Sequence, residues 1–357
     1  MSIRIKHESP RIAIRGLLHF HYDPTMQTRP FGNTGITTSE IGLGCWQFGG
    51  DWGTCSDDDA MNTLSAAVEA GVTFFDTADV YGRGRSETLI GQFLKEKKLR
   101  GKITVATKLG RLAGYPSAYS LELFRKCTED SLRRLNIPAL DITQLHCVPK
   151  HYIKTGEVFG WLEILKKEGK IKHYGASVET MEEALGCLNH AGCESLQIIF
   201  NIFRQKPIGM LFEKAKAKGV ALIIRLPLAS GLLSGKFTKT TTFPPQDHRT
   251  YNRDGQALNV GETFAGLPFQ KGIELVDGVK EIFTSAGLLS SATMAQLATR
   301  WILDHDAVSV VIPGAKDAQQ ARDNAAASEL PALSGAVHDE LAKFYERQVR
   351  ANIRGPY

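Results

Sequence analysis

From residue 41 onward, short apolar runs alternate regularly with longer segments of helical periodicity. The runs are mostly continuous rather than alternating apolar and polar, which is typical of strands buried on both faces of a parallel sheet. Eight strands alternating with eight helices have one favoured closed arrangement, the (β/α)8 or TIM barrel, with an open doubly wound sheet as the alternative. We expect strands at 41–44, 72–75, 103–107, 140–145, 171–175, 195–199, 220–225 and 308–312. We expect helices near 57–70, 86–98, 120–136, 156–169, 179–190, 207–218, 291–304 and 317–326.

The glycine pattern separates these two α/β arrangements. A dinucleotide-binding doubly wound sheet carries GxGxxG directly after its first strand. Here the first expected strand runs into residues 44–50, GCWQFGG, in which the glycines have a different spacing. The later triplet Gly82-Arg83-Gly84 lacks the third glycine. The pattern therefore favours the barrel.

The chain of 357 residues is longer than a barrel of ~250 residues requires. We expect residues 1–25 to be a disordered extension, a weak targeting peptide or the product of a misplaced start, with a single domain over 26–357. Within that domain, residues 26–40 read as a β-hairpin cap with a turn at Asn33-Thr34-Gly35. A long segment at 226–290, helical around 268–286, fits a functional loop that covers a cofactor. A tail with an extra C-terminal helix near 336–350 completes the partition.

Composition excludes several functional classes. The net charge of +5 comes from 43 basic and 38 acidic residues without a long basic block, so no nucleic-acid partner is expected. No apolar run approaches the ~18 residues that cross a bilayer, so no membrane partner is expected either. The 6 cysteines form no CxxC pair and no zinc-like spacing with the 10 histidines, which indicates a cytoplasmic protein without a metal or a disulfide framework.

Polar residues follow the expected strands, at positions that share one rim in a barrel. Asp76 follows the second strand, Lys108 the third and His146 the fourth. A glycosidase needs two facing carboxylates and a metal hydrolase needs several His and Asp ligands, so a rim with one Asp and one His disfavours both.

These three residues, together with Tyr81 in the loop after Asp76, can form a proton donor. The phenol of Tyr81 has an ordinary pKa of ~10, and an ammonium group from Lys108 would lower it. Asp76 would hold Lys108 charged, and His146 would donate a hydrogen bond to a substrate carbonyl oxygen. Such a site can protonate an oxygen while hydride arrives on its carbon, which requires a nicotinamide cofactor.

Several segments together resemble the aldo-keto reductase superfamily, over about Met26 to about residue 327. The resemblance implies a barrel plugged at its bottom by the N-terminal hairpin, with NADP(H) extended across its top. It implies Tyr81 as the general acid, with Asp76, Lys108 and His146 in the roles given above. The segments are GVTFFDTADVYG at 71–82, SE at 86–87, LIG at 89–91, ATK at 106–108, LH at 145–146, KIKHYGAS at 170–177, PL at 227–228, GLLSGK at 231–236 and IPGAK at 312–316.

The resemblance also implies cofactor contacts. Ser177 and Gln197 match positions that hold the nicotinamide carboxamide, whereas Val178 stands where many members have Asn. Arg225 stands where an aromatic ring often stacks on the nicotinamide, and a planar guanidinium can stack too. Lys316 matches the partner of a 2′-phosphate, which favours NADP(H) over NAD(H). The remaining implied contacts are Leu228, Gly231, Leu232 and Lys236 around the pyrophosphate and Gly314, Gln320, Asp323 and Asn324 with Lys316 around the adenine end.

Aromatic residues in the loop after the first strand suggest an apolar or sugar-stacking substrate pocket, built from Trp46, Phe48, Trp52 and Val148. The favoured activity is reduction of an aldehyde or ketone to an alcohol. Two alternatives stay open, namely a sugar or polyol dehydrogenase that works in the oxidative direction and a nucleotide-sensing regulatory subunit. The expected partner is a small carbonyl or sugar substrate, and the oligomeric state is not predicted.

Overall fold

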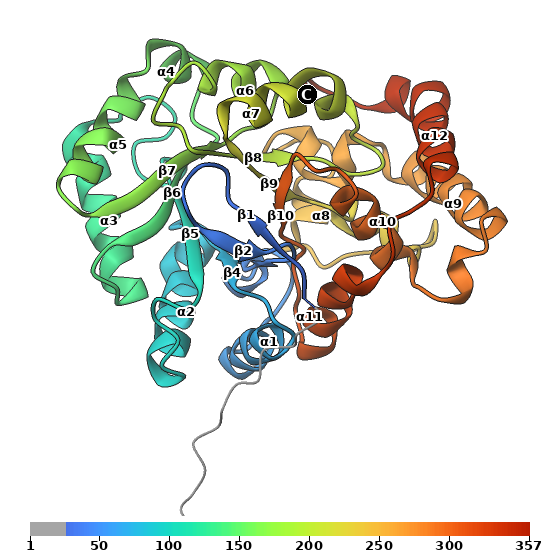
Figure 1. The fold of residues 1–357 in the computed structure, drawn as a ribbon, viewed down its shortest axis with the longest axis horizontal. Coiled ribbons are helices and arrows are strands. Elements are labelled where there is room, and N and C mark those ends of the chain that lie inside the picture. Colours follow the sequence, from blue (N-terminus) through green and yellow to red (C-terminus); the bar gives the residue numbers. More distant parts are fainter. Residues whose placement is uncertain (1–25) are drawn as a thin grey trace, which may run out of the picture.

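The computed structural model describes residues 26–357, so the expected N-terminal extension lies outside the described residues. In the described part, strands β3 to β10 form one parallel sheet in chain order, ringed by helices (Figure 1). Parallel bridges from Ile41 to Val311 and from Gly44 to Gly314 join its two edges. The fold is therefore the predicted (β/α)8 barrel. The strands are β3 (Leu43–Gly44), β4 (Phe74–Asp76), β5 (Thr104–Leu109), β6 (Leu140–His146), β7 (Ile171–Ser177), β8 (Ser195–Ile199), β9 (Ala221–Arg225) and β10 (Val308–Val311).

Several barrel helices begin at side-chain caps that the sequence supplies. Ser56, Thr180 and Thr293 each form a capping box with the residue three positions later, which satisfies otherwise unpaired amide groups of the first turn. The apolar faces of these helices bury the main core against the outside of the sheet. The helices are α1 (Asp57–Glu69), α2 (Arg85–Glu96), α3 (Leu121–Leu135), α5 (Glu157–Lys167), α6 (Met181–Cys187), α7 (Glu213–Lys218), α10 (Met294–Leu303) and α11 (Ala318–Ala325).

The predicted hairpin closes one end of the barrel. Strands β1 (Thr28–Pro30) and β2 (Thr37–Ser39) pair antiparallel, and they lie across the barrel in Figure 1. The fully buried Phe31 belongs to the interior cluster of the barrel. Its ring lies 5.6 Å from that of Phe74, the first residue of β4. The hairpin thus plugs the N-terminal ends of the strands and leaves the opposite rim for a site.

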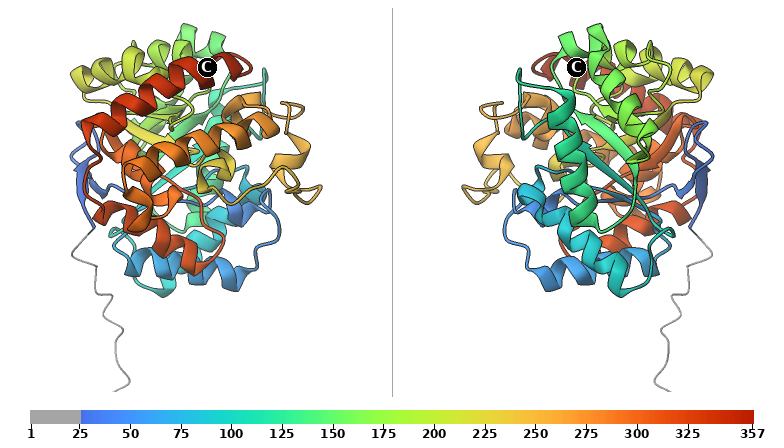
Figure 2. Two further views of the ribbon diagram at one scale, coloured as in Figure 1. Left: turned by 90° about the vertical axis from the view of Figure 1, so that its right-hand side faces the viewer. Right: turned by 90° about the vertical axis from the view of Figure 1, so that its left-hand side faces the viewer.

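The residues beyond the barrel units form further helices. The long segment contains α9 (Phe269–Ser285) and the tail contains α12 (Gly335–Phe344), close to the helices predicted there. The long segment also contains the short helix α8 (His248–Tyr251), which was not predicted. α12 packs on α9 (Figure 2). The short helix α4 (Lys150–Thr155) was not predicted. Within residues 26–357, no helix combines the length and apolar character that crossing a membrane requires.

Candidate active site

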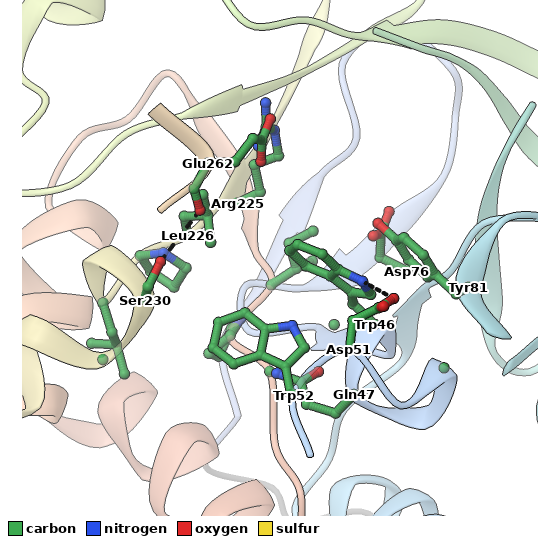
Figure 3. Close-up of a pocket in the computed structure, with 18 of the residues that line it drawn as sticks. Trp46, Gln47, Asp51, Trp52, Asp76, Tyr81, Arg225, Leu226, Ser230 and Glu262 are labelled. Carbon is green, nitrogen blue, oxygen red and sulfur yellow. Dashed lines mark hydrogen bonds and ion pairs between the residues drawn. The ribbon is translucent and has the colours of Figure 1, made fainter. Parts of the chain in front are cut away.

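A cavity of about 1080 Å³ opens at the carboxyl ends of the parallel strands. Its wall includes Asp76 from β4, His146 from β6, Ser177 from β7 and Arg225 from β9. Tyr81 lines it as well, from the loop that follows β4 (Figure 3). The parallel register of the strands thus brings the predicted rim residues to one site.

A chain of short contacts joins three of the four predicted catalytic residues. The ammonium Nζ of Lys108 lies 2.5 Å from Asp76 Oδ1 and donates to the Thr77 carbonyl at 2.7 Å. The same Nζ lies 3.3 Å from the phenol oxygen of Tyr81. The amide of Gln197 donates to the other oxygen of Asp76 at 2.7 Å. Lys108 is fully buried, so its charge acts on Tyr81 without screening by water.

The pKa of Tyr81 differs from the sequence-based prediction. Burial of the phenol raises its pKa to about 12. The charge of Lys108 lowers the pKa in the predicted sense, but burial outweighs this effect and Asp76 acts against it. The predicted lowering effect of Lys108 is therefore present, but the net direction was not predicted, because sequence cannot give the cost of removing water from a phenolate. The structure places a protonated phenol in the cavity at neutral pH.

Lys108 is charged at neutral pH, whereas His146 is neutral. Burial lowers the pKa of Lys108, but the pairing with Asp76 and Tyr81 outweighs it and the net pKa is raised, so Lys108 stays charged. Burial, followed by the charges of Lys108 and other nearby cations, holds the pKa of His146 well below 6.5. The neutral imidazole of His146 meets the Tyr81 ring edge-on, with centroids 5.9 Å apart. It retains one N–H that can donate to a substrate oxygen.

The residues implied as cofactor contacts lie around the same cavity, with one exception. Leu232 does not line it, because its buried side chain packs against Gly272 of α9. Gly231 has a φ of +97°, and a Cβ there would lie 2.7 Å from the Phe237 ring. This position therefore requires glycine. The implied contacts that line the cavity are Ser177, Gln197, Arg225, Leu228, Gly231, Lys236, Gly314, Lys316, Gln320, Asp323 and Asn324.

The polar groups of this wall fit a dinucleotide phosphate. Lys236 and Lys316 line the cavity, and neither ammonium group has an ion-pair partner among residues 26–357. The first turns of α10 and α11 also reach the cavity through Gln296 and Gln320. Helix N-termini attract anions, and unpaired lysines do the same. The donor set therefore fits the phosphate groups of NADP(H).

Arg225 is held by a residue that the sequence did not single out. Its Nη1 lies 2.5 Å from Glu262 Oε2, and its Nη2 donates to the Val178 carbonyl at 3.0 Å. Glu262 lies in the short turn Val260–Glu262 of the long segment and is almost fully buried. No local motif marks it, because its role depends on a contact with a residue 37 positions away.

The two predicted tryptophans form an aromatic corner beside Tyr81. The Trp46 ring is nearly parallel to the Tyr81 ring, with centroids 5.8 Å apart and 19° between the planes. Its Nε1 donates to Asp51 at 2.9 Å, as Figure 3 shows. Trp52 meets Trp46 edge-on and packs against His248 of the long segment at 4.1 Å. Both indoles line the cavity.

Phe48 and Val148 do not line the cavity, so their prediction as pocket residues is corrected. Phe48 lies two residues after Trp46 within the 3-10 turn Trp46–Gly49 and is the buried residue of that turn. Phe48 is fully buried and Val148 is 2% exposed, both within the main apolar core. Sequence reasoning also missed four cavity residues that no motif marks. Arg111 and Tyr115 lie in the loop between β5 and α3, and Arg249 and Tyr251 lie in the short helix α8.

One group of side chains bears on the prediction that no metal is bound. Among the described residues, ligand atoms of Cys147, Glu179 and Glu262 lie within 4.8 Å of one another. Glu179 pairs with Arg111 at 3.3 Å, and Glu262 pairs with Arg225. The two guanidinium groups thus offset the negative charge that would attract a cation.

The comparisons with known proteins agree with this geometry. The aldo/keto reductase family model matches residues 40–346, so the chain belongs to this family of oxidoreductases. It is 32% identical over 320 residues to aldo-keto reductase str7 of Strobilurus tenacellus, covering 85% of this chain and 88% of that relative. It is 28% identical over 342 residues to the NADH-specific methylglyoxal reductase of Escherichia coli, covering 90% and 100%. The solved structure of the glycerol dehydrogenase AKR11B4 from Gluconobacter oxydans superposes with a TM-score of 0.73 at 26% identity, covering 94% of this chain and 99% of that chain.

Proposed function

We propose that the protein is an NADP(H)-dependent reductase that converts an aldehyde or ketone to an alcohol, with Tyr81 as the general acid. The observation that carries this proposal is the buried chain from Asp76 through Lys108 to Tyr81, which ends at a cavity that His146 also lines. Bound NADPH would supply hydride to the carbonyl carbon. The protein's own residues would then manage the developing charge on the carbonyl oxygen.

Each of the four residues has a distinct part in this reaction. The protonated phenol of Tyr81 gives its proton to the carbonyl oxygen. The Lys108 ammonium stabilises the phenolate that is left, and Asp76 keeps Lys108 charged and in place. The neutral His146 donates a hydrogen bond to the same oxygen and orients the carbonyl group. A raised phenol pKa suits a donor, because the proton remains available at neutral pH.

The cofactor preference rests on Lys316. An ammonium group at the cavity wall without an ion-pair partner among residues 26–357 suits the 2′-phosphate that distinguishes NADP(H) from NAD(H). We therefore propose NADP(H) as the preferred cofactor of this chain, unlike the E. coli relative whose name specifies NADH.

A second candidate is the oxidation of a polyol or sugar. The corner formed by Trp46 and Trp52 offers flat apolar faces, and Asp51 and Arg249 line the same cavity with hydrogen-bonding groups. A polyhydroxylated ligand can use both kinds of surface. The solved structure that superposes well is named as a glycerol dehydrogenase.

The test is a steady-state screen in both directions. NADPH and NADH oxidation is followed with aldehydes, quinones and sugars, and NADP+ reduction with the matching alcohols and polyols. Turnover with carbonyl compounds supports the reductase, whereas turnover of polyols alone supports the second candidate. Tight binding of NADPH without turnover of any compound would instead identify a nucleotide-sensing protein.

A further inference from the structure

Glu262 is a buried carboxylate that reaches the cavity from the long segment. Its side chain is 7% exposed and that of its partner Arg225 is 11% exposed. Arg225 ends β9 and belongs to the barrel, whereas Glu262 belongs to the segment that covers the rim. The ion pair therefore joins two parts of the molecule that no backbone hydrogen-bond ladder connects at this point.

The position of the Arg225 guanidinium depends on two contacts. Besides Glu262, it donates to the carbonyl of Val178, the residue directly after Ser177. Its Nε has no partner among the described residues. Loss of Glu262 would leave one hydrogen bond for a buried cation, and such a group moves or recruits water to recover its solvation.

The same turn also fixes the loop at the cavity wall. The Ser230 hydroxyl donates to the Glu262 carbonyl at 3.3 Å and accepts from the Phe264 amide at 3.1 Å. Ser230 lines the cavity beside Gly231, at the start of the cofactor-covering segment. The side chain and the backbone of Glu262 thus hold two neighbouring parts of the wall.

The backbone on both sides of this contact is strained. Ala229 and Ser230 have φ values of +47° and +56°, and Phe264 and Ala265 have values of +53° and +57°. Residues other than glycine rarely adopt this left-handed backbone conformation, and it persists where surrounding contacts impose it. The contacts of Glu262 lie between these two segments and are placed to impose the left-handed conformation on both.

We propose that Glu262 is a positioning residue that holds Arg225 at the nicotinamide end of the cofactor site. This inference rests on the proposed nicotinamide cofactor. It goes further, because it assigns the fixed position of Arg225 at the nicotinamide end to a residue of the long segment. Loss of Glu262 then weakens contacts to the nicotinamide half of NADP(H) and spares those to the adenine half, which Lys316 and α11 provide.

The test measures binding rather than turnover. Dissociation constants are determined by calorimetry for NADP+ and for adenosine 2′,5′-bisphosphate, which carries the adenine half with its phosphates and lacks nicotinamide. In Glu262→Gln we expect the dissociation constant of NADP+ to rise about tenfold, the scale of one lost charge-assisted contact. We expect that of the bisphosphate to change by less than about twofold.

Four further variants, one of them a double variant, separate positioning from general destabilisation. Glu262→Asp keeps the charge on a shorter side chain and should show the same selective loss of NADP+ binding to a smaller extent. This variant can replace Glu262→Gln if the latter does not fold. Arg225→Gln should raise the dissociation constant of NADP+ and leave that of the bisphosphate unchanged. In the double variant with Glu262→Gln, the dissociation constant of NADP+ should rise little further. Glu179→Gln, the matched control, removes the neighbouring carboxylate that pairs with Arg111 and should leave NADP+ binding within about twofold.

The outcomes decide between the possibilities. Equal losses for both ligands, or no loss for NADP+ in either Glu262 variant, would overturn the positioning role while leaving the proposed cofactor intact. A wild-type protein that binds neither ligand would overturn the proposed cofactor and this inference with it.

Discussion

The cavity has two parts that are built in different ways: the catalytic end, where the proposed catalytic residues lie, and the cover, which is the long segment proposed to close over the cofactor. At the catalytic end, Asp76, Lys108 and His146 stand on adjacent parallel strands, and their relative positions follow from the register of the barrel. In the cover, Glu262 and Ser230 meet residues that lie tens of positions away along an irregular segment. The arrangement of the catalytic end depends on regular secondary structure, whereas the arrangement of the cover depends on individual side-chain contacts. The variants below test this difference, from the largest expected effect to the smallest.

The largest effect is expected at Tyr81, the proposed proton donor. Tyr81→Phe removes the acidic hydroxyl and keeps the ring stacked on Trp46. We expect the turnover number for carbonyl reduction to fall about 10²- to 10⁴-fold, the usual contribution of a general acid. The dissociation constant of NADPH, measured by fluorescence titration, should stay within about twofold. Retention of most activity would assign the proton to another group.

A smaller effect is expected at Lys316, in the cofactor wall. Lys316→Ala removes a cation that has no ion-pair partner in the described part of the chain. We expect the dissociation constant of NADPH to rise about 10- to 100-fold, the scale of a charge-assisted contact to phosphate. That of NADH should change by about twofold or less, because it lacks the 2′-phosphate. Equal changes for both would place the phosphate elsewhere.

The contact between the long segment and the first loop should make stability sensitive to acid. Burial lowers the pKa of His248 to about 4, so the unfolded chain binds its proton first as the pH falls below 6.5. Stability from this residue is therefore complete above pH 6.5 and declines toward pH 4. Between pH 7 and pH 5 we expect urea denaturation to show roughly 2 kcal/mol more loss in the wild type than in His248→Phe. An identical loss in both proteins would show that His248 accepts a proton without unfolding.

The smallest effect is expected when the pH is changed and the rate of carbonyl reduction is measured. With a Tyr81 pKa of about 12 and a neutral His146, the proton donor and the hydrogen-bond donor keep their states across the neutral range. We expect kcat/KM for carbonyl reduction to vary by less than about twofold between pH 6.5 and pH 9. A clear break within this range would mean that a group with a pKa near neutrality supplies the proton.

The outcome of the sequence predictions follows the same division. The strands, the hairpin cap and the extra helices α9 and α12 were predicted correctly, because apolar periodicity and turn residues are local properties, whereas the short helices α4 and α8 were not predicted. The common rim of Asp76, Lys108 and His146 was predicted from the positions of strand ends, and Tyr81 was added from the loop after Asp76. Phe48, Val148 and Leu232 were misplaced, because the side of a loop to which a side chain points depends on packing against α-helices distant in the sequence. Glu262 was missed because nothing near it in sequence indicates its partner.

The sequence by itself determined the barrel and the set of residues around its rim, since parallel strands that end together place their following residues together. Only the tertiary structure decided the protonation state of Tyr81, because desolvation outweighs the attraction of Lys108. It also decided that Arg225 is paired with Glu262 and that His248 supports the tryptophan corner. These properties depend on burial and on contacts between residues far apart in the chain, and neither is encoded in any local pattern.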